Sequence, residues 1–390
     1  MYLPESIQKA FKLLNNYEAY LVGGCIRNHL LNIPINDYDM CTSATPQEII
    51  ECFKDYKVIP TGIKHGTITV IIDHTHIEIT TFRKDEGITD NRHPKKVIFT
   101  SILEEDASRR DFTINSLYYH PDKGIIDYFH GITDIHDHII RSINDPNIRF
   151  QEDALRILRA LRFSLQLDFK IENNTSIAIH NNKQLLKKLS AERIIDELKK
   201  IMSYPKAYDI IISYYDIFVT IIDDLKYLSH DATNKMLLAL TNSHPSFIIR
   251  MAIILSPCNN YHQILKRLKL SNEEIRSIET IIKYHNVPLD NKIQIKYLLK
   301  QTSDIDNILL CKKAYGMDTS LIQDTYQKII ANKECYQLKD LSISGKDLIN
   351  LGINNKLYST ILNECLDKVI QNQLSNNKEI LLDYIKGKYL

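Results

Sequence analysis

Hydrophobic and polar positions follow two different patterns along the chain. In the N-terminal part, short apolar runs predict strands over residues 20–22 and 37–40, and alternation predicts a hairpin of residues 67–72 and 76–82. A Gly-Gly pair predicts a turn into a short helix over residues 26–31. After about residue 150 the apolar spacing becomes helical. We therefore expect an α+β fold, with a small mixed β-sheet in an N-terminal head and an all-helical remainder.

The composition limits the classes of protein that remain. With 390 residues, 44% of them hydrophobic and 25% charged, the chain is that of a folded protein of roughly two to four domains. No apolar run reaches the roughly 18 residues of a membrane span, and no signal-peptide pattern is present, so we expect a cytoplasmic protein. Seven cysteines without a CxxC pair argue against a disulfide framework or a structural zinc site. Because 49 basic residues balance 48 acidic ones, nucleic-acid binding would have to come from local patches.

The first candidate for chemistry joins a glycine turn to a pair of acidic residues. A Gly-Gly-x-x-Arg element ends at Arg27 and is followed by Asp37 and Asp39, which share a face if they lie on a strand. Carboxylate oxygens suit Mg²⁺, and the turn would let backbone N–H groups and Arg27 approach a polyphosphate. Glu78 on the hairpin could supply a third carboxylate. Together these parts indicate metal-assisted nucleotidyl transfer, although a tight turn or a solvated strand end would explain either part alone.

A second candidate is the cluster Arg109-Arg110-Asp111. One guanidinium could face a triphosphate or a base while Asp111 orients it. Taken alone, the same residues are more often a surface ion-pair cluster.

The third candidate lies on a helix that we predict from Glu152 onward. An apolar stripe and a charged stripe run along this helix, and the charged residues are Glu152, Asp153, Arg156, Arg159 and Arg162. Three arginines outnumber two acids, and an Asp beside an Arg can pair with the edge of a base. A salt-bridged, solvated helix face is the alternative interpretation.

Seven segments of the chain, taken in order, resemble the class II tRNA nucleotidyltransferases, the family of bacterial CCA-adding enzymes and poly(A) polymerases. The segments are LVGGCIRNHLLNIPINDYDM, TGIKHGTITV, IEITTFR, RHPKKVIF, RRDFTINSLYY, FQEDALRILRALRF and LSAERIIDELKKI. The resemblance covers about residues 18–202 and implies nucleotide addition to the 3′ end of RNA.

The resemblance also implies a role for each candidate residue. Asp37 and Asp39 would bind the catalytic Mg²⁺, with Glu78 as the third acidic group. The residues that would contact the nucleotide, ATP or CTP, are Gly24, Arg27, Arg110, Asp153, Arg156, Arg159 and Arg162. Among these, Asp153 and Arg156 would select the incoming base without a nucleic-acid template. The segment of residues 190–194 would support their helix.

The implied organisation is a head over residues 1–140, a helical neck over 141–202 that selects the nucleotide, and a helical body and tail over 203–390. The body and tail would grip the acceptor and TΨC arms of tRNA. Lysines that could contact phosphates there are Lys266, Lys269, Lys386 and Lys388. The expected partners are tRNA, ATP and CTP, with no membrane and no DNA. The chain departs from the usual family pattern at Asn28, where an Asp is common, without losing an implied metal ligand.

Several activities remain open within this resemblance. The preferred product is the complete 3′-terminal CCA of tRNA, because the chain lacks the basic extensions that are typical of poly(A) polymerases. The alternatives are a poly(A) polymerase, a partial enzyme that adds only CC or only A, and a catalytically silent RNA-binding protein. A His-Asp phosphohydrolase is disfavoured, since His136-Asp137 and His230-Asp231 lack further ligands at a suitable spacing.

The charged segment of residues 83–99 bears on the choice between CC and CCA. It has little apolar periodicity, so we predict a mobile loop. The family resemblance implies that enzymes with this loop complete CCA and that CC-only enzymes lack most of it. A passive surface connection is the alternative.

Overall fold

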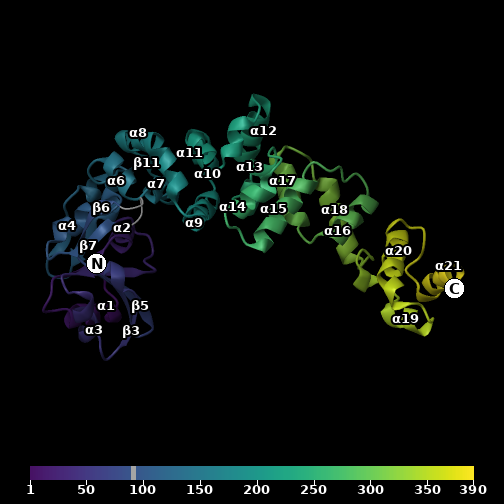
Figure 1. The fold of residues 1–390 in the computed structure, drawn as a ribbon, viewed down its shortest axis with the longest axis horizontal. Coiled ribbons are helices and arrows are strands. Elements are labelled where there is room, and N and C mark those ends of the chain that lie inside the picture. Colours follow the sequence, from purple (N-terminus) through teal and green to yellow (C-terminus); the bar gives the residue numbers. More distant parts are fainter. Residues whose placement is uncertain (89–93) are drawn as a thin grey trace. The chain divides into compact units, whose positions relative to one another are not determined.

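A computed structural model describes residues 1–88 and 94–390 of the chain. These residues form two compact units, Met1–Lys226 and Tyr227–Leu390, and each is described by itself (Figure 1). The predicted boundaries at residues 140 and 202 both fall inside the first unit.

The first unit is built on a mixed sheet. Within the described residues, seven strands lie in the order β3-β4-β5-β2-β1-β8-β9, and the one parallel pair is β2 with β5. The strands are β1 (Ala19–Val22), β2 (Tyr38–Thr42), β3 (Lys57–Gly62), β4 (Thr67–Ile72), β5 (Thr75–Thr81), β8 (Leu117–His120) and β9 (Gly124–Asp127). All four residues of β1 are buried, as expected for a central strand that is covered on both faces. The predicted mixed sheet is therefore confirmed.

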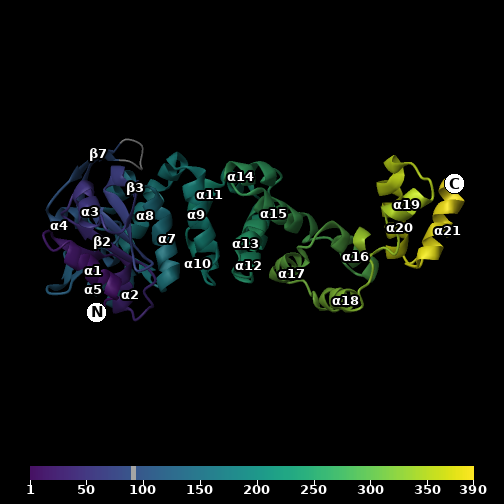
Figure 2. The ribbon, with the colours of Figure 1, turned by 90° about the horizontal axis from the view of Figure 1, so that it is seen from below.

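The helices of the first unit surround the sheet and extend beyond it. They are α1 (Glu5–Leu13), α2 (Gly24–Leu30), α3 (Pro46–Cys52), α4 (Leu103–Ser108), α5 (Gly131–His136), α6 (Pro146–Glu152), α7 (Leu155–Leu167), α8 (Asn173–Asn182), α9 (Ala191–Met202), α10 (Ala207–Ser213) and α11 (Tyr215–Ile221). A short parallel pair, β10 (Ile139–Ile140) and β11 (Lys170–Ile171), lies among them. Helices α7 and α9 pack side by side, and both views show this (Figures 1 and 2).

The helix predicted from Glu152 is interrupted in the structure. Helix α6 ends at Glu152, and Asp153 has an extended backbone, with φ −144° and ψ 101°. The carboxylate of Asp153 accepts a hydrogen bond from the N–H of Leu155 at 3.1 Å, at the start of α7. An Asp side chain that accepts from the backbone N–H two residues on competes with helical continuation, so the prediction of one continuous helix was wrong here. The predicted apolar stripe of Ala154, Leu158 and Leu161 is fully buried.

The segment predicted as a loop contains regular structure. Strands β6 (Arg83–Ile88) and β7 (Pro94–Phe99) pair antiparallel, with Arg83 opposite Phe99. The backbone N–H of Thr100 donates to the carbonyl of Phe82 at 3.0 Å and closes the base of this hairpin. Pairing satisfies the backbone groups even though apolar periodicity is weak, which is why the pattern failed to predict strands. Residues 89–93 of the predicted loop lie outside the described residues.

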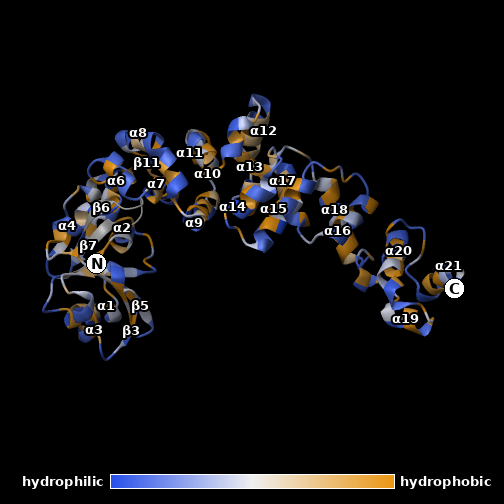
Figure 3. Cartoon of the chain, in the orientation of Figure 1, coloured by the Kyte–Doolittle hydropathy of each residue, from blue (hydrophilic) through white to orange (hydrophobic). Residues whose placement is uncertain are grey.

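The second unit is helical throughout. Its helices are α12 (His230–Thr241), α13 (Phe247–Leu255), α14 (Tyr261–Arg267), α15 (Asn272–Tyr284), α16 (Lys292–Gln301), α17 (Ile305–Ala314), α18 (Ser320–Ala331), α19 (Gly345–Asn350), α20 (Tyr358–Ile370) and α21 (Lys378–Tyr389). Hydrophobic and hydrophilic residues alternate along them (Figure 3), and α13 packs against α12, α15 and α17. A separate core around Leu348, Ile361 and Leu381 joins α19, α20 and α21. The predicted helical remainder is confirmed, except for the two-residue strand β11 within the predicted neck. No helix among the described residues combines the length and apolar character that crossing a bilayer requires.

Candidate active site

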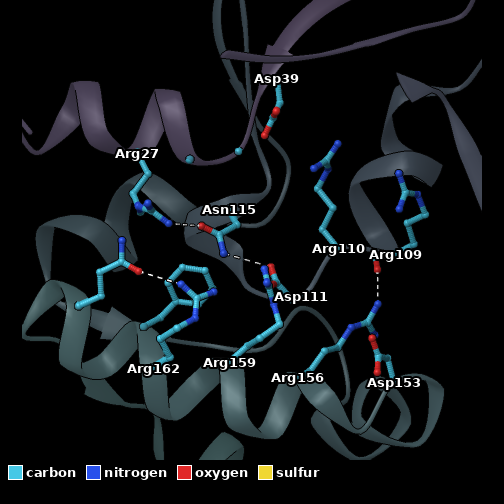
Figure 4. Close-up of a pocket in the computed structure, with 14 residues that line it drawn as sticks. Arg27, Asp39, Arg109, Arg110, Asp111, Asn115, Asp153, Arg156, Arg159 and Arg162 are labelled. Carbon is cyan, nitrogen blue, oxygen red and sulfur yellow. Dashed lines mark hydrogen bonds and ion pairs between the residues drawn. The ribbon is translucent and has the colours of Figure 1, made fainter. Parts of the chain in front are cut away.

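A polar cleft of about 440 Å³ opens in the first unit where α2 and β2 face α7. Residues from four separate segments of the chain, 23–27, 39, 109–115 and 153–166, line it, and Figure 4 shows their side chains. They are Gly23, Gly24, Arg27, Asp39, Arg109, Arg110, Asp111, Asn115, Asp153, Arg156, Arg159, Arg162, Phe163 and Gln166. Eight of the ten predicted site residues lie in this cleft, and six of its lining residues are arginines. Such a density of guanidinium groups favours an anionic ligand that is rich in phosphate.

The glycine turn places α2 at the edge of the cleft. Gly23 has φ +77°, a left-handed backbone that residues with a Cβ rarely adopt. Its carbonyl accepts hydrogen bonds from the N–H groups of Ile26 and Arg27 and so begins the helix. The buried Arg27 side chain then extends toward Asn115, as Figure 4 shows.

The predicted acidic group lies beside this turn on the central strands. Asp39 is directly opposite Glu78 in the parallel pairing of β2 and β5, and Asp37 precedes β2 by one residue. Asp39 lines the cleft, whereas Asp37 and Glu78 do not. Desolvation, together with the negative charges of Glu78 and Asp37, raises the pKa of Asp39 to about 6. Neighbouring carboxylates repel one another when both are charged, and a bound divalent cation would relieve this repulsion. Their oxygens are also the ligands that such a cation prefers. Elsewhere in the described residues, as here, no three His, Cys, Asp or Glu side chains converge closely enough to enclose a metal ion.

Asp106 holds both arginines of the second cluster. Its Oδ1 accepts from Arg109 Nη2 at 2.6 Å, and its Oδ2 accepts from Arg110 Nη2 at 3.0 Å and from the Tyr118 hydroxyl at 2.9 Å. Burial acts to raise the pKa of Asp106, but Arg110 and Arg109 outweigh it and bring the pKa to about 2. We predicted that Asp111 orients one of these arginines. That was wrong, because Asp111 turns to α7 instead.

The partner of Asp111 is Arg159. Arg159 Nη2 and Nε donate to Asp111 Oδ2 at 2.6 and 2.9 Å. Burial would raise the pKa of the Asp111 carboxyl, yet Arg159 and Asn115 bring it to about 2. This pair ties the strand side of the cleft to the middle of α7.

Arg156 is held mainly by backbone carbonyls. Its Nη1 donates to the carbonyl of Arg149 at 3.0 Å and to Glu152 Oε2 at 2.9 Å, and its Nη2 donates to the carbonyl of Arg109 at 2.6 Å. The neighbouring Asp153 accepts from Arg193 Nη2 at 2.8 Å. Arg193 belongs to the segment predicted to support this helix, and it fixes the Asp153 carboxylate in the lining of the cleft.

Arg162 is fixed by α9 and by its own helix. Its Nε donates to Glu197 Oε2 at 2.7 Å, and its Nη1 donates to Gln166 Oε1 at 3.0 Å. Its guanidinium also lies 4.2 Å from the ring centroid of Phe163. The predicted cationic surplus of α7 is therefore largely matched by acids that lie far away in the sequence.

Four residues of this arrangement were missed by the sequence reasoning: Asp106, Asn115, Phe163 and Glu197. Asp106 had a usable signal, because Arg109 and Arg110 follow it at the i+3 and i+4 positions of a short helix. The contacts of Asn115 and Glu197 join residues that are 88 and 35 positions apart. No local pattern predicts such contacts.

Comparison with known proteins gives a consistent family. The family model described as "Poly A polymerase head domain" matches residues 19–141, and the one for tRNA nucleotidyltransferase domain 2 matches residues 242–385. The CCA-adding enzyme of Pediococcus pentosaceus is 35% identical over 399 residues, covering 98% of both chains. That of Staphylococcus haemolyticus is 35% identical, covering 95% of this chain and 94% of its own.

Solved structures agree. A crystal structure of the Bacillus stearothermophilus CCA-adding enzyme in complex with CTP has a TM-score of 0.79 and 26% identity, covering 99% of this chain and 98% of that one. The Thermotoga maritima CCA-adding enzyme shares the fold, with a TM-score of 0.73 at 22% identity over 99% of this chain and 96% of its own. Full-length identity above 30% and a shared fold lead to one conclusion: this chain belongs to the CCA-adding enzymes of the class II tRNA nucleotidyltransferase family.

Proposed function

We propose that this protein adds the 3′-terminal CCA sequence to tRNA, using CTP and ATP and releasing pyrophosphate. The observation that carries the proposal is the arginine-lined cleft with Asp39 at its edge and the Asp153–Arg156 pair on its α7 side. The chain aligns with CCA-adding enzymes over nearly their whole length, and one such enzyme was solved in complex with CTP.

The reaction is the attack of an RNA 3′-hydroxyl on the α-phosphate of the nucleotide. Members of the nucleotidyltransferase family generally use divalent metals, and we propose that Asp37 and Asp39 hold Mg²⁺, with Glu78 as a further acidic group. A cation bound there would stabilise charge on the attacking and leaving oxygens. Gly24, Arg27 and Arg110 would bind the phosphates and orient the leaving pyrophosphate along the cleft.

Base selection belongs to the α7 side of the cleft. The carboxylate of Asp153 offers acceptors, and the guanidinium of Arg156 offers donors. Arg193 holds the carboxylate of Asp153, and the carbonyl of Arg109 holds the guanidinium of Arg156. These protein groups would take the place of a nucleic-acid template. Arg159 and Arg162, which follow Arg156 along α7, would complete the nucleotide contacts. We assign the head to residues 1–140, the selecting neck to 141–202, and the binding of the acceptor and TΨC arms of cytoplasmic tRNA to residues 203–390.

The decisive experiment incubates the purified protein with tRNA that lacks CCA, in CTP, ATP or both, and sequences the 3′ ends. Complete CCA in the presence of both nucleotides is the expected product. Ends that stop at CC or gain A only after a supplied CC would indicate a partial enzyme. Long A tails would indicate a poly(A) polymerase, and unchanged ends would indicate an RNA-binding protein without activity.

A further inference from the structure

Arg110 is anchored through two of its three guanidinium nitrogens. Its Nη2 donates to Asp106 Oδ2 at 3.0 Å, and its Nε donates to the Tyr118 hydroxyl at 2.8 Å. The hydroxyl in turn donates to Asp106 Oδ2 at 2.9 Å, which closes a ring of three hydrogen bonds. Within the described residues, the third nitrogen of the guanidinium, Nη1, forms no hydrogen bond.

The nitrogen without a partner lies beside the glycine turn of the cleft. A Cβ atom at Gly23 would lie 4.0 Å from Arg110 Nη1. The guanidinium also extends toward Asp39, as Figure 4 shows, and it counteracts the rise in the pKa of Asp39 that desolvation causes. Arg110 Nη1 is therefore available to an anion in the part of the cleft where the phosphates of a nucleotide are proposed to bind.

The central sheet determines where the Tyr118 hydroxyl lies. Tyr118 is fully buried on β8, and the register of β8 with β1 places it opposite Val22, the residue before Gly23. The N–H of Gly23 donates to the carbonyl of Leu117 at 3.1 Å. One pair of strands thus carries both the glycine turn and the tyrosine, so backbone pairing fixes the position of the hydroxyl relative to the turn.

Asp106 alone would hold Arg110 loosely. Its Oδ1 accepts from Arg109 Nε and Nη2 at 2.9 and 2.6 Å and from the N–H of Arg83 at 3.3 Å, which leaves Oδ2 for Arg110. A guanidinium held at one nitrogen can rotate about that contact, whereas two contacts fix its plane. Burial holds the pKa of Tyr118 well above its ordinary value, so the hydroxyl stays neutral. It therefore adds the second contact without reducing the positive charge of Arg110.

We propose that Tyr118 is a positioning residue that acts through Arg110: its hydroxyl fixes the plane of the guanidinium so that Nη1 meets the triphosphate of the incoming nucleotide beside the glycine turn. The inference rests on the proposed nucleotide site and deepens it. Because the contact is with phosphate and not with a base, Tyr118 affects CTP and ATP alike. Asp106 still holds Arg110 when the hydroxyl is absent, so binding is weakened and not abolished.

The test compares Tyr118→Phe with Tyr20→Phe. Both remove a hydroxyl from a buried tyrosine, on the neighbouring strands β8 and β1. The Tyr20 hydroxyl bonds to Glu18 and Lys123, neither of which lines the cleft, so this variant is the matched control.

The dissociation constants of CTP, ATP and inorganic tripolyphosphate are measured by calorimetry with the full-length protein and Mg²⁺, without tRNA. For Tyr118→Phe we expect all three constants to rise by a similar factor, about three- to tenfold, because the phosphate contact is no longer oriented by a hydrogen bond to a charged group. For Tyr20→Phe the constants should stay near those of the wild type.

A second background distinguishes positioning from a general effect on the fold. In Arg110→Gln the phosphate contact is already absent, so the addition of Tyr118→Phe should not raise the dissociation constants further. If Tyr118 only maintains the local fold, its hydroxyl should matter by the same factor in both backgrounds, and the melting temperature should fall in both.

Three results would overturn the inference. The first is a set of dissociation constants for Tyr118→Phe that match those of Tyr20→Phe. The second is an equal effect of Tyr118→Phe in the wild-type and Arg110→Gln backgrounds. The third is a shift for CTP that differs strongly from the shifts for ATP and tripolyphosphate.

The wild-type protein separates this inference from the proposed function. A wild type that binds none of the three anions would refute the nucleotide site and both proposals with it. A wild type that binds CTP but adds nothing to tRNA would refute the proposed function and leave this inference standing. Complete CCA addition by the wild type, with unchanged binding in Tyr118→Phe, would refute this inference alone.

Discussion

The side chains of the cleft are oriented by other side chains before any nucleotide arrives. Asp106 fixes Arg109 and Arg110, Asp111 fixes Arg159, and carbonyl groups fix Arg156. Groups held in this way need little reorganisation when a charged substrate binds, which is the usual origin of electrostatic stabilisation in enzymes. Substitution of a single one of these side chains should therefore have a clear effect on the chemistry of the cleft.

Removal of either carboxylate, Asp37 or Asp39, should strongly reduce nucleotide addition. For Asp37→Asn and for Asp39→Asn we expect a loss of activity of at least about a hundredfold, because the carboxylate contributes to metal affinity and to stabilisation of transition-state charge. The melting temperature and tRNA binding should stay close to wild type. Turnover is measured with CTP and tRNA, and Asp55→Asn, an exposed acid in the head, is the matched control. Near-normal turnover of Asp37→Asn would show that the metal assignment is wrong.

Loss of the Arg156 side chain should blur base selection. In Arg156→Ala the donors to a base edge disappear, while Asp37, Asp39 and Glu78 are unchanged. Misincorporation of UTP and GTP should therefore rise more than the rate of addition falls. The carbonyls of Arg109 and Arg149 also lose their donor, which should lower the stability by about 1–3 kcal/mol. Misincorporation is read by sequencing the 3′ ends. Unchanged nucleotide preference with lower activity would give Arg156 a purely structural role.

At the scale of elements, one buried ion pair joins the helices α7 and α9. Arg162 and Glu197 are 12% and 5% exposed at their side chains, so neither can rely on water if the other is removed. Glu197→Gln should lower the stability by about 3 kcal/mol, within the range for breaking a buried pair, and the melting temperature by several degrees. Glu192→Gln, on the exposed side of the same helix, should change neither. Thermal unfolding of both variants checks the difference, and equal melting temperatures would contradict it.

The hairpin of β6 and β7 offers a test of complete CCA addition. Replacing residues 84–93 by a few glycines removes most of β6 while keeping Phe82 and Thr100, which close the base. We expect CC addition to remain and the final A to be strongly reduced, because the segment would help to change the site from C to A selection. Sequencing of the 3′ ends after a fixed time measures both steps. A shortened protein that completes CCA at the normal rate would make the segment a passive connection.

How far the sequence predicts these elements depends on the range of the interactions that form them. The strands around Tyr20 and Met40, the glycine turn and the helical second part follow from local periodicity and are present in the structure. The helix break at Asp153 was not predicted, because a single side-chain hydrogen bond accompanies it and no periodic pattern marks it. The partners Asn115 and Glu197 could not be predicted, since tertiary packing alone brings them to the cleft.

At the scale of the whole molecule, the two units divide the lining of the cleft from the candidate RNA-binding lysines. Every residue that lines the cleft belongs to Met1–Lys226, whereas the lysines proposed to contact tRNA belong to Tyr227–Leu390. These lysines differ in the structure. Lys388 pairs with Glu364 at 2.5 Å and Lys386 lies 3.7 Å from Asp383. Lys266 and Lys269 are exposed and, within the described residues, form no ion pair.

The division predicts that tRNA affinity and nucleotide affinity can be changed separately. The double variant Lys266→Gln and Lys269→Gln removes two uncompensated charges, so the KM for tRNA should rise, and the salt dependence of tRNA binding should weaken by about one unit of slope per lysine. The dissociation constant of CTP should not change, because the cleft is untouched. Lys388→Gln is the matched control: it removes a cation that Glu364 already neutralises, and its effect on tRNA should be smaller. Steady-state addition assays give the KM for tRNA, and binding titrations of tRNA and CTP at several salt concentrations give the dissociation constants and the salt slope. If the double variant and the control weaken tRNA equally, ion pairing in the second unit does not determine which lysines bind RNA.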